Sequence, residues 1–310
     1  MIIMKNSRYI LFALFVSMLM SITAQLDPTY RQYRFNALLI NPAQAGANDF
    51  DDVSVLGTQY WVNMPGAPRT LTLSGNMRPM DNVGIGATIV ADENGPVTTS
   101  SANLLGAYHL KLSDAWKLSL GLKASAINHS VMLSQLKTTQ QNDPDMQNDL
   151  ATGLSFNAGY GFLAYTDRFY VGFSQQRVAA YRFQSVDMAS YIDQRSGYIS
   201  YAGYDFDVSE RLSFRPSVLT IFGHGGPLFL DANANFTFDE IFDFGVSYQL
   251  NGSLGSIFGI TIKERLKIGY AYSYPVNRLN TVSIQSHEVA LRLILNKKKL
   301  KTAESPRFFN

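Results

Sequence analysis

The four histidines of the chain are the first side chains to test for catalysis or metal binding. They stand at His109, His129, His224 and His287, without the close spacing that metal-ligating histidines show. The chain has no cysteine, which excludes thiolate ligands, a cysteine nucleophile and disulfides. The patterns of a serine elbow, a zincin helix, a phosphate loop and a dinucleotide fold are also missing. We therefore predict that the protein is not an enzyme and binds no cofactor.

One polar stretch could offer oxygen ligands to calcium. Asn142, Asp143, Asp145 and Asp149 lie close together in it, and calcium takes amide and carboxylate oxygens. The stretch lacks the spaced glycine and the bidentate glutamate of a calcium-binding loop. A calcium site and a solvated loop both stay open as interpretations.

Two short motifs fit strands better than chemistry. Gly84-Ile85-Gly86 is not followed by a helical pattern, so a pair of strand glycines explains it better than a phosphate-binding loop. His287 and Glu288 are adjacent, and adjacent strand residues point to opposite faces. They therefore cannot converge on one substrate as an acid–base pair.

The composition indicates which kind of secondary structure the chain forms. Only 16% of residues are charged, while there are 17 Tyr and 20 Phe. After residue 24 no apolar run approaches the roughly 20 residues of a spanning helix. Such a composition is typical of a transmembrane β-barrel, and a soluble β-sandwich could share it. The net charge of +2 is too small to indicate binding of nucleic acid.

Residues 116–126 alternate strictly between apolar and polar or small side chains. Leu120 and Leu122 belong to the apolar row, while Lys117 and Lys123 belong to the other. A period of two places the rows on opposite faces of a strand. Similar segments predict fourteen strands, at residues 53–61, 69–78, 82–92, 98–112, 115–127, 151–165, 168–176, 197–207, 210–222, 228–238, 241–250, 254–262, 265–274 and 285–295.

The connections between these strands are sorted by length. Every other connection is short and polar, as at residues 79–81, 113–114, 166–167, 208–209, 239–240 and 263–264. The interleaved connections are mostly longer. Outer-membrane barrels have short periplasmic turns and longer extracellular loops, whereas a sandwich has no reason for this sorting. We predict a transmembrane β-barrel of about fourteen antiparallel strands, with the apolar row against lipid and Lys117 and Lys123 facing the lumen.

The two ends of the chain differ from the strand region. Basic residues, an apolar run and Ala24 predict a signal peptide over residues 1–24 and hence delivery to the outer membrane. We expect residues 25–50 to contain a helical turn over 34–40 and to fold against the periplasmic mouth or to plug the lumen of a barrel over 51–296. A basic periplasmic tail over 297–310 would contact a periplasmic partner or lipid headgroups through Lys297, Lys298, Lys299 and Lys301.

The two longest predicted loops carry apolar side chains among amides and acids. These side chains are Met132, Leu133, Leu136, Tyr181, Phe183, Met188 and Tyr191. Apolar anchors framed by polar groups suit a protein interface. They are candidates for binding a secreted cargo, and packing over the barrel mouth is the alternative.

Several motifs occur in an order that points to one family. Residues 27–46 contain Asn41, Pro42, Ala43 and Gly46, and residues 59–70 contain Gly66, Ala67 and Pro68. Further stretches are YVGFS, RPS, KIGYAYSY and SHEVAL, the last with Ser286, His287 and Glu288. Together they resemble the PorP/SprF family of outer-membrane proteins of the type IX secretion system in Bacteroidetes. The chain departs from the family pattern at the interposed Tyr60 and in its basic tail.

The resemblance implies a non-enzymatic barrel surrounded by outer-membrane lipid. Such a protein would assist secretion or surface attachment of cargo, such as gliding adhesins with type B C-terminal signals. Its partners would include periplasmic components of the same machinery. A general diffusion porin or small-solute channel is the alternative, and an open lumen would distinguish it.

Overall fold

The computed structural model describes residues 31–48, 50–62, 64–133, 149–179, 196–223, 228–250, 252–276 and 285–297. Several predicted features lie outside these residues: the signal peptide, Asn142, Asp143, Asp145, Leu136, Tyr181, Phe183, Met188, Tyr191, His224, Lys298, Lys299 and Lys301. Within the described part of the chain, no helix has both the length and the apolarity to cross a bilayer.

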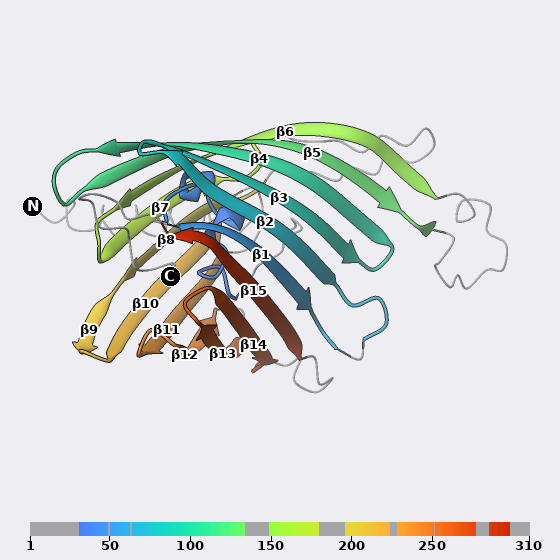
Figure 1. The fold of residues 1–310 in the computed structure, drawn as a ribbon. Helices are drawn as coiled ribbons and strands as arrows, with labels where there is room; N and C mark the ends of the chain where they lie inside the picture. Colours follow the sequence, from blue (N-terminus) through green and yellow to red (C-terminus); the bar gives the residue numbers. More distant parts are fainter. Residues whose placement is uncertain are drawn as a thin grey trace, which may run out of the picture.

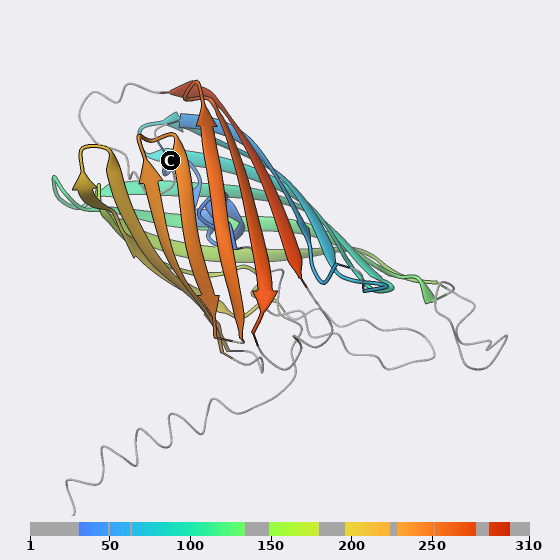
Figure 2. The same cartoon turned by 90° about the horizontal axis from the view of Figure 1, so that it is seen from below.

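The strands form one antiparallel sheet that closes on itself (Figures 1 and 2). Neighbouring strands are mostly consecutive in sequence, β15 pairs with β1, and β10 pairs with β11 to complete the ring. The strands are β1 (Phe50–Gln59), β2 (Arg69–Met80), β3 (Val83–Asn94), β4 (Val97–Lys111), β5 (Lys117–Val131), β6 (Leu150–Tyr165), β7 (Phe169–Gln175), β8 (Tyr198–Tyr204), β9 (Phe206–Ser209), β10 (Leu212–Phe222), β11 (Phe229–Phe238), β12 (Phe242–Gln249), β13 (Ser253–Ile262), β14 (Leu266–Pro275) and β15 (Ser286–Lys297).

Strands β8 and β9 are two parts of one crossing of the wall. Both pair with β10, and only Asp205 separates them. The fifteen strands of the sheet therefore make fourteen crossings, since two of them share one. The prediction of a closed barrel of about fourteen antiparallel strands is confirmed.

The predicted orientation of β5 is also confirmed. Leu120 and Leu122 are 38% and 71% exposed on the outer face, whereas Ser119 is fully buried on the inner face. Lys123 points inward, with its Nζ 2.8 Å from Oε1 of Gln176. Lys117 is also on the inner side, with its Nζ 5.8 Å from the centre of the Tyr165 ring. An apolar exterior around a polar interior is what a barrel in lipid requires.

The two ends of the barrel have different connections. We call the end with the short turns after β2, β4, β6, β9, β11 and β13 the turn rim, and the opposite end the loop rim (Figure 1). Asp239 at the turn rim has a φ of 53° and Glu240 a φ of 56°, the left-handed pair that a tight hairpin needs. Arg211 of the neighbouring turn donates to the Asp239 carboxylate at 2.6 Å, and this bond lowers the pKa of Asp239.

Candidate functional site in the barrel lumen

Residues 31–48, here called the lumen segment, lie inside the ring of strands (Figure 2). At one end, the Arg31 guanidinium donates to Gln249 at 3.1 Å and to Ser253 at 2.6 Å, the facing ends of β12 and β13 at the loop rim. At the other end, the carbonyl oxygen of Ala45 lies 2.9 Å from Nε2 of His109, near the turn-rim end of β4. The segment therefore crosses the lumen from the loop rim towards the turn rim.

Glu288 fixes the loop-rim end of the lumen segment. Its Oε1 accepts a hydrogen bond from the backbone N–H of Gln32 at 2.8 Å. Its Oε2 accepts one from the backbone N–H of Arg31 at 3.3 Å. The Thr58 hydroxyl donates to Oε2 at 3.2 Å. His287 points away from this group, because its Nδ1 lies 2.7 Å from the exposed Tyr270 hydroxyl.

Tyr33 and Asn36 fix the middle of the segment to opposite sides of the wall. The Tyr33 hydroxyl is 2.8 Å from Oγ of Ser217 on β10. The Tyr33 side chain is almost fully buried there, so this hydroxyl is kept from water. Asn36 Nδ2 donates to Ser54 Oγ on β1 at 3.2 Å and to Ser74 Oγ on β2 at 2.6 Å.

The Asn41-Pro42-Ala43 motif forms the next anchor. Asn41 is fully buried and donates to the Phe162 carbonyl and to the Tyr201 hydroxyl, each at 2.9 Å. Its Oδ1 accepts from the Ala43 backbone N–H at 2.8 Å and so caps a short 3₁₀ turn, η2 (Pro42–Gln44). The helical turn predicted over 34–40 is shorter, a 3₁₀ turn η1 (Ala37–Leu39). Asn41 is extended, because a residue before proline avoids the helical region.

Glycines on the inner wall give the lumen segment its room. A Cβ at Gly121 would lie 2.1 Å from the Ala43 nitrogen, and a Cβ at Gly161 would lie 2.0 Å from Asn41 Oδ1. Gly46 in the segment has a φ of 64°, and its own Cβ would lie 2.5 Å from the Gly84 Cα. Larger residues at these positions would force the segment away from the wall, so wall and segment are shaped for each other.

The remaining family-motif residues meet at the loop rim. Gly66, Ala67 and Pro68 lie in the connection from β1 to β2, where the Pro68 carbonyl accepts from the Tyr60 N–H at 2.9 Å. The Ser286 hydroxyl, at the start of β15, accepts from the Trp61 N–H at 3.3 Å. The motif residues therefore lie in two parts of the structure, the lumen segment and one sector of the loop rim.

Ion pairs inside the wall are a feature that the sequence prediction missed. Lys267 Nζ lies 2.8 Å from Asp243 Oδ2, and Arg215 Nε lies 3.2 Å from Asp205 Oδ2. The Arg292 guanidinium lies 3.6 Å from Asp52 and over the ring of Phe35 in the lumen segment, at 4.9 Å. Alternation along the strands could have placed these charges in the lumen, but it gives no partners.

The predicted contact residues lie at the two rims. Met132 and Leu133 follow β5 at the loop rim and are half-buried, and the Met132 N–H donates to the Pro96 carbonyl at 2.8 Å. Lys297 ends β15 at the turn rim, where its backbone faces Phe50. Within the described ranges, no three His, Cys, Asp or Glu side chains are grouped as a metal site would need.

The sequence also matches a known protein family. Residues 22–293 match the family described as type IX secretion system membrane protein PorP/SprF. No curated protein matches the chain.

Solved outer-membrane proteins share the fold at low identity. The CymD monoaromatic hydrocarbon channel aligns with a TM-score of 0.50 and 10% identity over 84% of this chain and 91% of that one. The toluene transporter TbuX of Ralstonia pickettii aligns with a TM-score of 0.48 and 13% identity, over 84% and 93% of the two chains. Omp33 of Acinetobacter baumannii gives a TM-score of 0.45 and 9% identity, over 81% and 100%. The likeness to CymD concerns the barrel fold alone.

Proposed function

The chain belongs to the PorP/SprF family of type IX secretion system membrane proteins, and we propose that it assists cargo without conducting solutes through its own lumen. The cargo would be secreted or surface-attached polypeptides, such as gliding adhesins with type B C-terminal signals. The observation that carries this proposal is the lumen segment, which hydrogen-bonds to inner-wall groups from β1 round to β15.

The polar groups of the inner wall support a closed lumen. In a porin, such groups line a water-filled path. Here the Ser119 hydroxyl donates to the Ala43 carbonyl at 2.7 Å, and Gln176 Nε2 donates to the Ile40 carbonyl at 2.6 Å. Wall groups that would otherwise face water instead bind the backbone of the segment. A barrel closed in this way contacts its partners at its two rims.

The two rims have separate roles in this proposal. The loop rim faces the cell exterior and contacts cargo, with Met132 and Leu133 among its anchors. The turn rim faces the periplasm and meets other components of the secretion machinery, where Lys297 ends the last strand. Charged pairs such as Arg211 with Asp239 keep this rim polar.

Deletion of the gene, with measurement of cargo on the cell surface, tests the secretion role. We expect surface cargo to fall and to return when the intact chain is supplied from a plasmid. Unchanged surface cargo in the deletion strain would reject the role.

Conductance distinguishes the proposal from its alternative, a diffusion porin or small-solute channel. The full mature chain in a planar bilayer should give no stable conductance steps. The measurement is made in about 1 M salt, where the screening length is short and fixed charges in the lumen hinder ions least. Regular steps from the folded wild-type barrel would favour the porin. An established porin measured in the same bilayer provides the positive control.

A further inference from the structure

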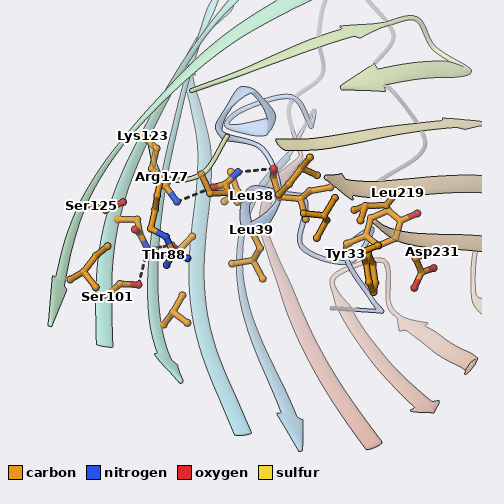
Figure 3. Close-up of a pocket in the computed structure, with 18 residues that line it drawn as sticks. Tyr33, Leu38, Leu39, Thr88, Ser101, Lys123, Ser125, Arg177, Leu219 and Asp231 are labelled. Atoms are coloured by element: carbon orange, nitrogen blue, oxygen red, sulfur yellow. Dashed lines mark hydrogen bonds between the residues drawn. The ribbon is translucent and has the colours of Figure 1, made fainter. Parts of the chain in front are cut away.

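Two cavities beside the lumen segment differ in their linings. The larger one, of about 120 Å³, lies against Leu38 and Leu39 (Figure 3). Three of its eighteen lining residues are charged: Lys123, Arg177 and Asp231. The smaller one, of about 70 Å³, has five charged residues among its ten. Charge is therefore concentrated around the smaller cavity, here called the charged cavity.

The charged cavity lies between the lumen segment and the turn rim. Arg34 and Phe35 of the segment line it on one side. Arg215, Asp243 and Lys267 line it on the wall, and each stands within three residues of a strand end at the turn rim. The side chains of Asp243 and Lys267 keep 18% and 15% exposure, so water reaches the cavity. Because these strand ends lie at the turn rim, the cavity is entered from that rim.

Cations outnumber acids in the lining of the charged cavity. Arg31, Arg34, Arg215 and Lys267 line it, against the single acid Asp243 among the lining residues. Both oxygens of this acid are engaged within the wall: Oδ2 lies 2.8 Å from Lys267 Nζ, and Oδ1 accepts from the Thr237 hydroxyl at 2.6 Å. A second acid outside the lining, Asp205, lies 3.2 Å from Arg215. The four cations therefore exceed these two acids.

Three of the cations are close to one another. Arg34 Nη1 donates to the Arg215 backbone carbonyl at 3.1 Å, which places the Arg34 guanidinium beside β10. The charge of Arg215 is within electrostatic range of both Arg34 and Lys267. Like charges repel more strongly inside a protein than in water, because the dielectric constant is lower. An anion between these side chains would relieve the repulsion.

We propose that the charged cavity binds one oxyanion, a carboxylate or phosphate group, that enters from the turn rim and lies between Arg34, Arg215 and Lys267. Guanidinium groups match the geometry of both oxyanions. One water needs about 10–15 Å³, and the cavity of about 70 Å³ is several times larger. An acidic side chain of a periplasmic polypeptide and a free small anion share this chemistry.

A cysteine placed in the cavity measures its local charge, because the natural chain has no cysteine. Ile257 lines the cavity, and Ser113 lies on an exposed turn of the same rim. In the folded, purified barrel, Ile257→Cys should prefer an anionic thiosulfonate over a cationic one several-fold more than Ser113→Cys does. Equal preference at the two positions would overturn the proposal. Failure of both reagents to reach Ile257→Cys would overturn it as well.

Inorganic phosphate tests occupancy in the same variants. At an ionic strength held constant with chloride, phosphate should slow anionic labelling of Ile257→Cys and leave Ser113→Cys unchanged. Adding Arg34→Gln should raise the half-protecting phosphate concentration about tenfold, the effect of one bond to a charged group. Lys111→Gln is the matched control, because Lys111 is an exposed cation paired with Asp114 at 2.8 Å. Protection that Arg34→Gln leaves unchanged would place the phosphate elsewhere and overturn the proposal.

A carboxylate built into the wall should compete with phosphate. Asn235 lines the cavity directly opposite Arg215 in the pairing of β10 with β11. Asn235→Asp in the Ile257→Cys background should therefore remove protection by phosphate. Asn82→Asp adds the same charge at an exposed position of the turn rim and should leave protection intact. Equal protection in both variants would contradict a site beside Arg215.

Cells distinguish the two sources of the oxyanion. If Arg34→Gln lowers co-purification of periplasmic components and Lys111→Gln does not, the oxyanion is an acidic side chain of a polypeptide. If co-purification is unchanged while phosphate protection is weakened, the oxyanion is a free small anion. The site itself is decided by the labelling data, whereas the secretion role is decided by the gene deletion.

Discussion

The carboxylate of Glu288 and the backbone of Gln32 are joined by a 2.8 Å hydrogen bond across 256 residues of sequence. The bond ties the last strand of the barrel to the first described residues of the chain. Strand β15 also pairs with β1, so this side-chain bond adds to the backbone pairing that closes the barrel. The lumen segment is thus attached where the two ends of the sheet meet.

Glu288→Gln should lower the stability of the folded barrel. The substitution replaces one of the two accepting oxygens by an NH₂ group, so one buried donor among Gln32, Arg31 and Thr58 loses its acceptor, which costs about 1–3 kcal/mol. Urea unfolding followed by heat-modifiable migration measures the loss. Glu93→Gln, which removes an exposed ion pair with Arg69, should change stability by less than about 1 kcal/mol. Equal midpoints for the two variants would show that the Glu288 anchor is dispensable.

Gly121→Val should displace the lumen segment from the wall. Even the first carbon of the new side chain would lie 2.1 Å from the Ala43 nitrogen, a distance that packed atoms cannot keep. We expect faster protease cleavage within residues 31–48 and irregular conductance. Gly106→Val is the control, because a Cβ there meets nothing within 4 Å. A protected segment in Gly121→Val would argue that the close fit has no structural role.

Leu120→Arg should destabilise the barrel by about 2–4 kcal/mol, the cost of a cation on the lipid face near mid-bilayer. Leu120 is 38% exposed on the outer face of β5. Lys123→Gln, three residues further on the inner face, should retain most of the stability, because an amide can still bond to Gln176. Unfolding in lipid vesicles compares the two variants. A larger loss for Lys123→Gln would reverse the assignment of the faces.

Epitope tags should reveal which rim faces outward. Tags at Ser113-Asp114 or Asp239-Glu240 lie on the turn rim and should stay hidden from antibody on intact cells. Tags within 134–148 or 180–195 should be accessible, because these residues lie in the long connections. Permeabilised cells provide the control for expression. Labelling of both sets on intact cells would contradict the proposed orientation.

The wall of the barrel could be predicted from sequence, but the contacts inside it could not. Alternation around Leu120 and Lys123 places side chains on the correct faces, because a period of two is a property of any strand. The break at Asp205 was missed, and its carboxylate is 3.2 Å from Arg215 on the next crossing. Asn41 bonds to the Phe162 carbonyl 121 residues away. No local pattern encodes such a pairing. The sequence therefore could not decide whether residues 25–50 fold against the periplasmic mouth or enter the lumen.

The tail lysines provide the last test, at the turn rim. Lys297 ends β15 at this rim, beside the backbone of Phe50. We expect Lys297, Lys298, Lys299 and Lys301 to contact an acidic periplasmic partner, at about 1 kcal/mol for each charge near an oppositely charged surface.

Replacing the four lysines by glutamine should therefore abolish co-purification of periplasmic components at low salt, while the barrel still assembles. Raising the salt should weaken the wild-type complex in the same way, because screening shortens the reach of exposed charges. Arg168→Gln is the matched control, since it removes a turn-rim cation that is already paired with Asp207. If the partners remain bound to the tail variant, the tail is only solvated, and the turns of the same rim become the next surface to test.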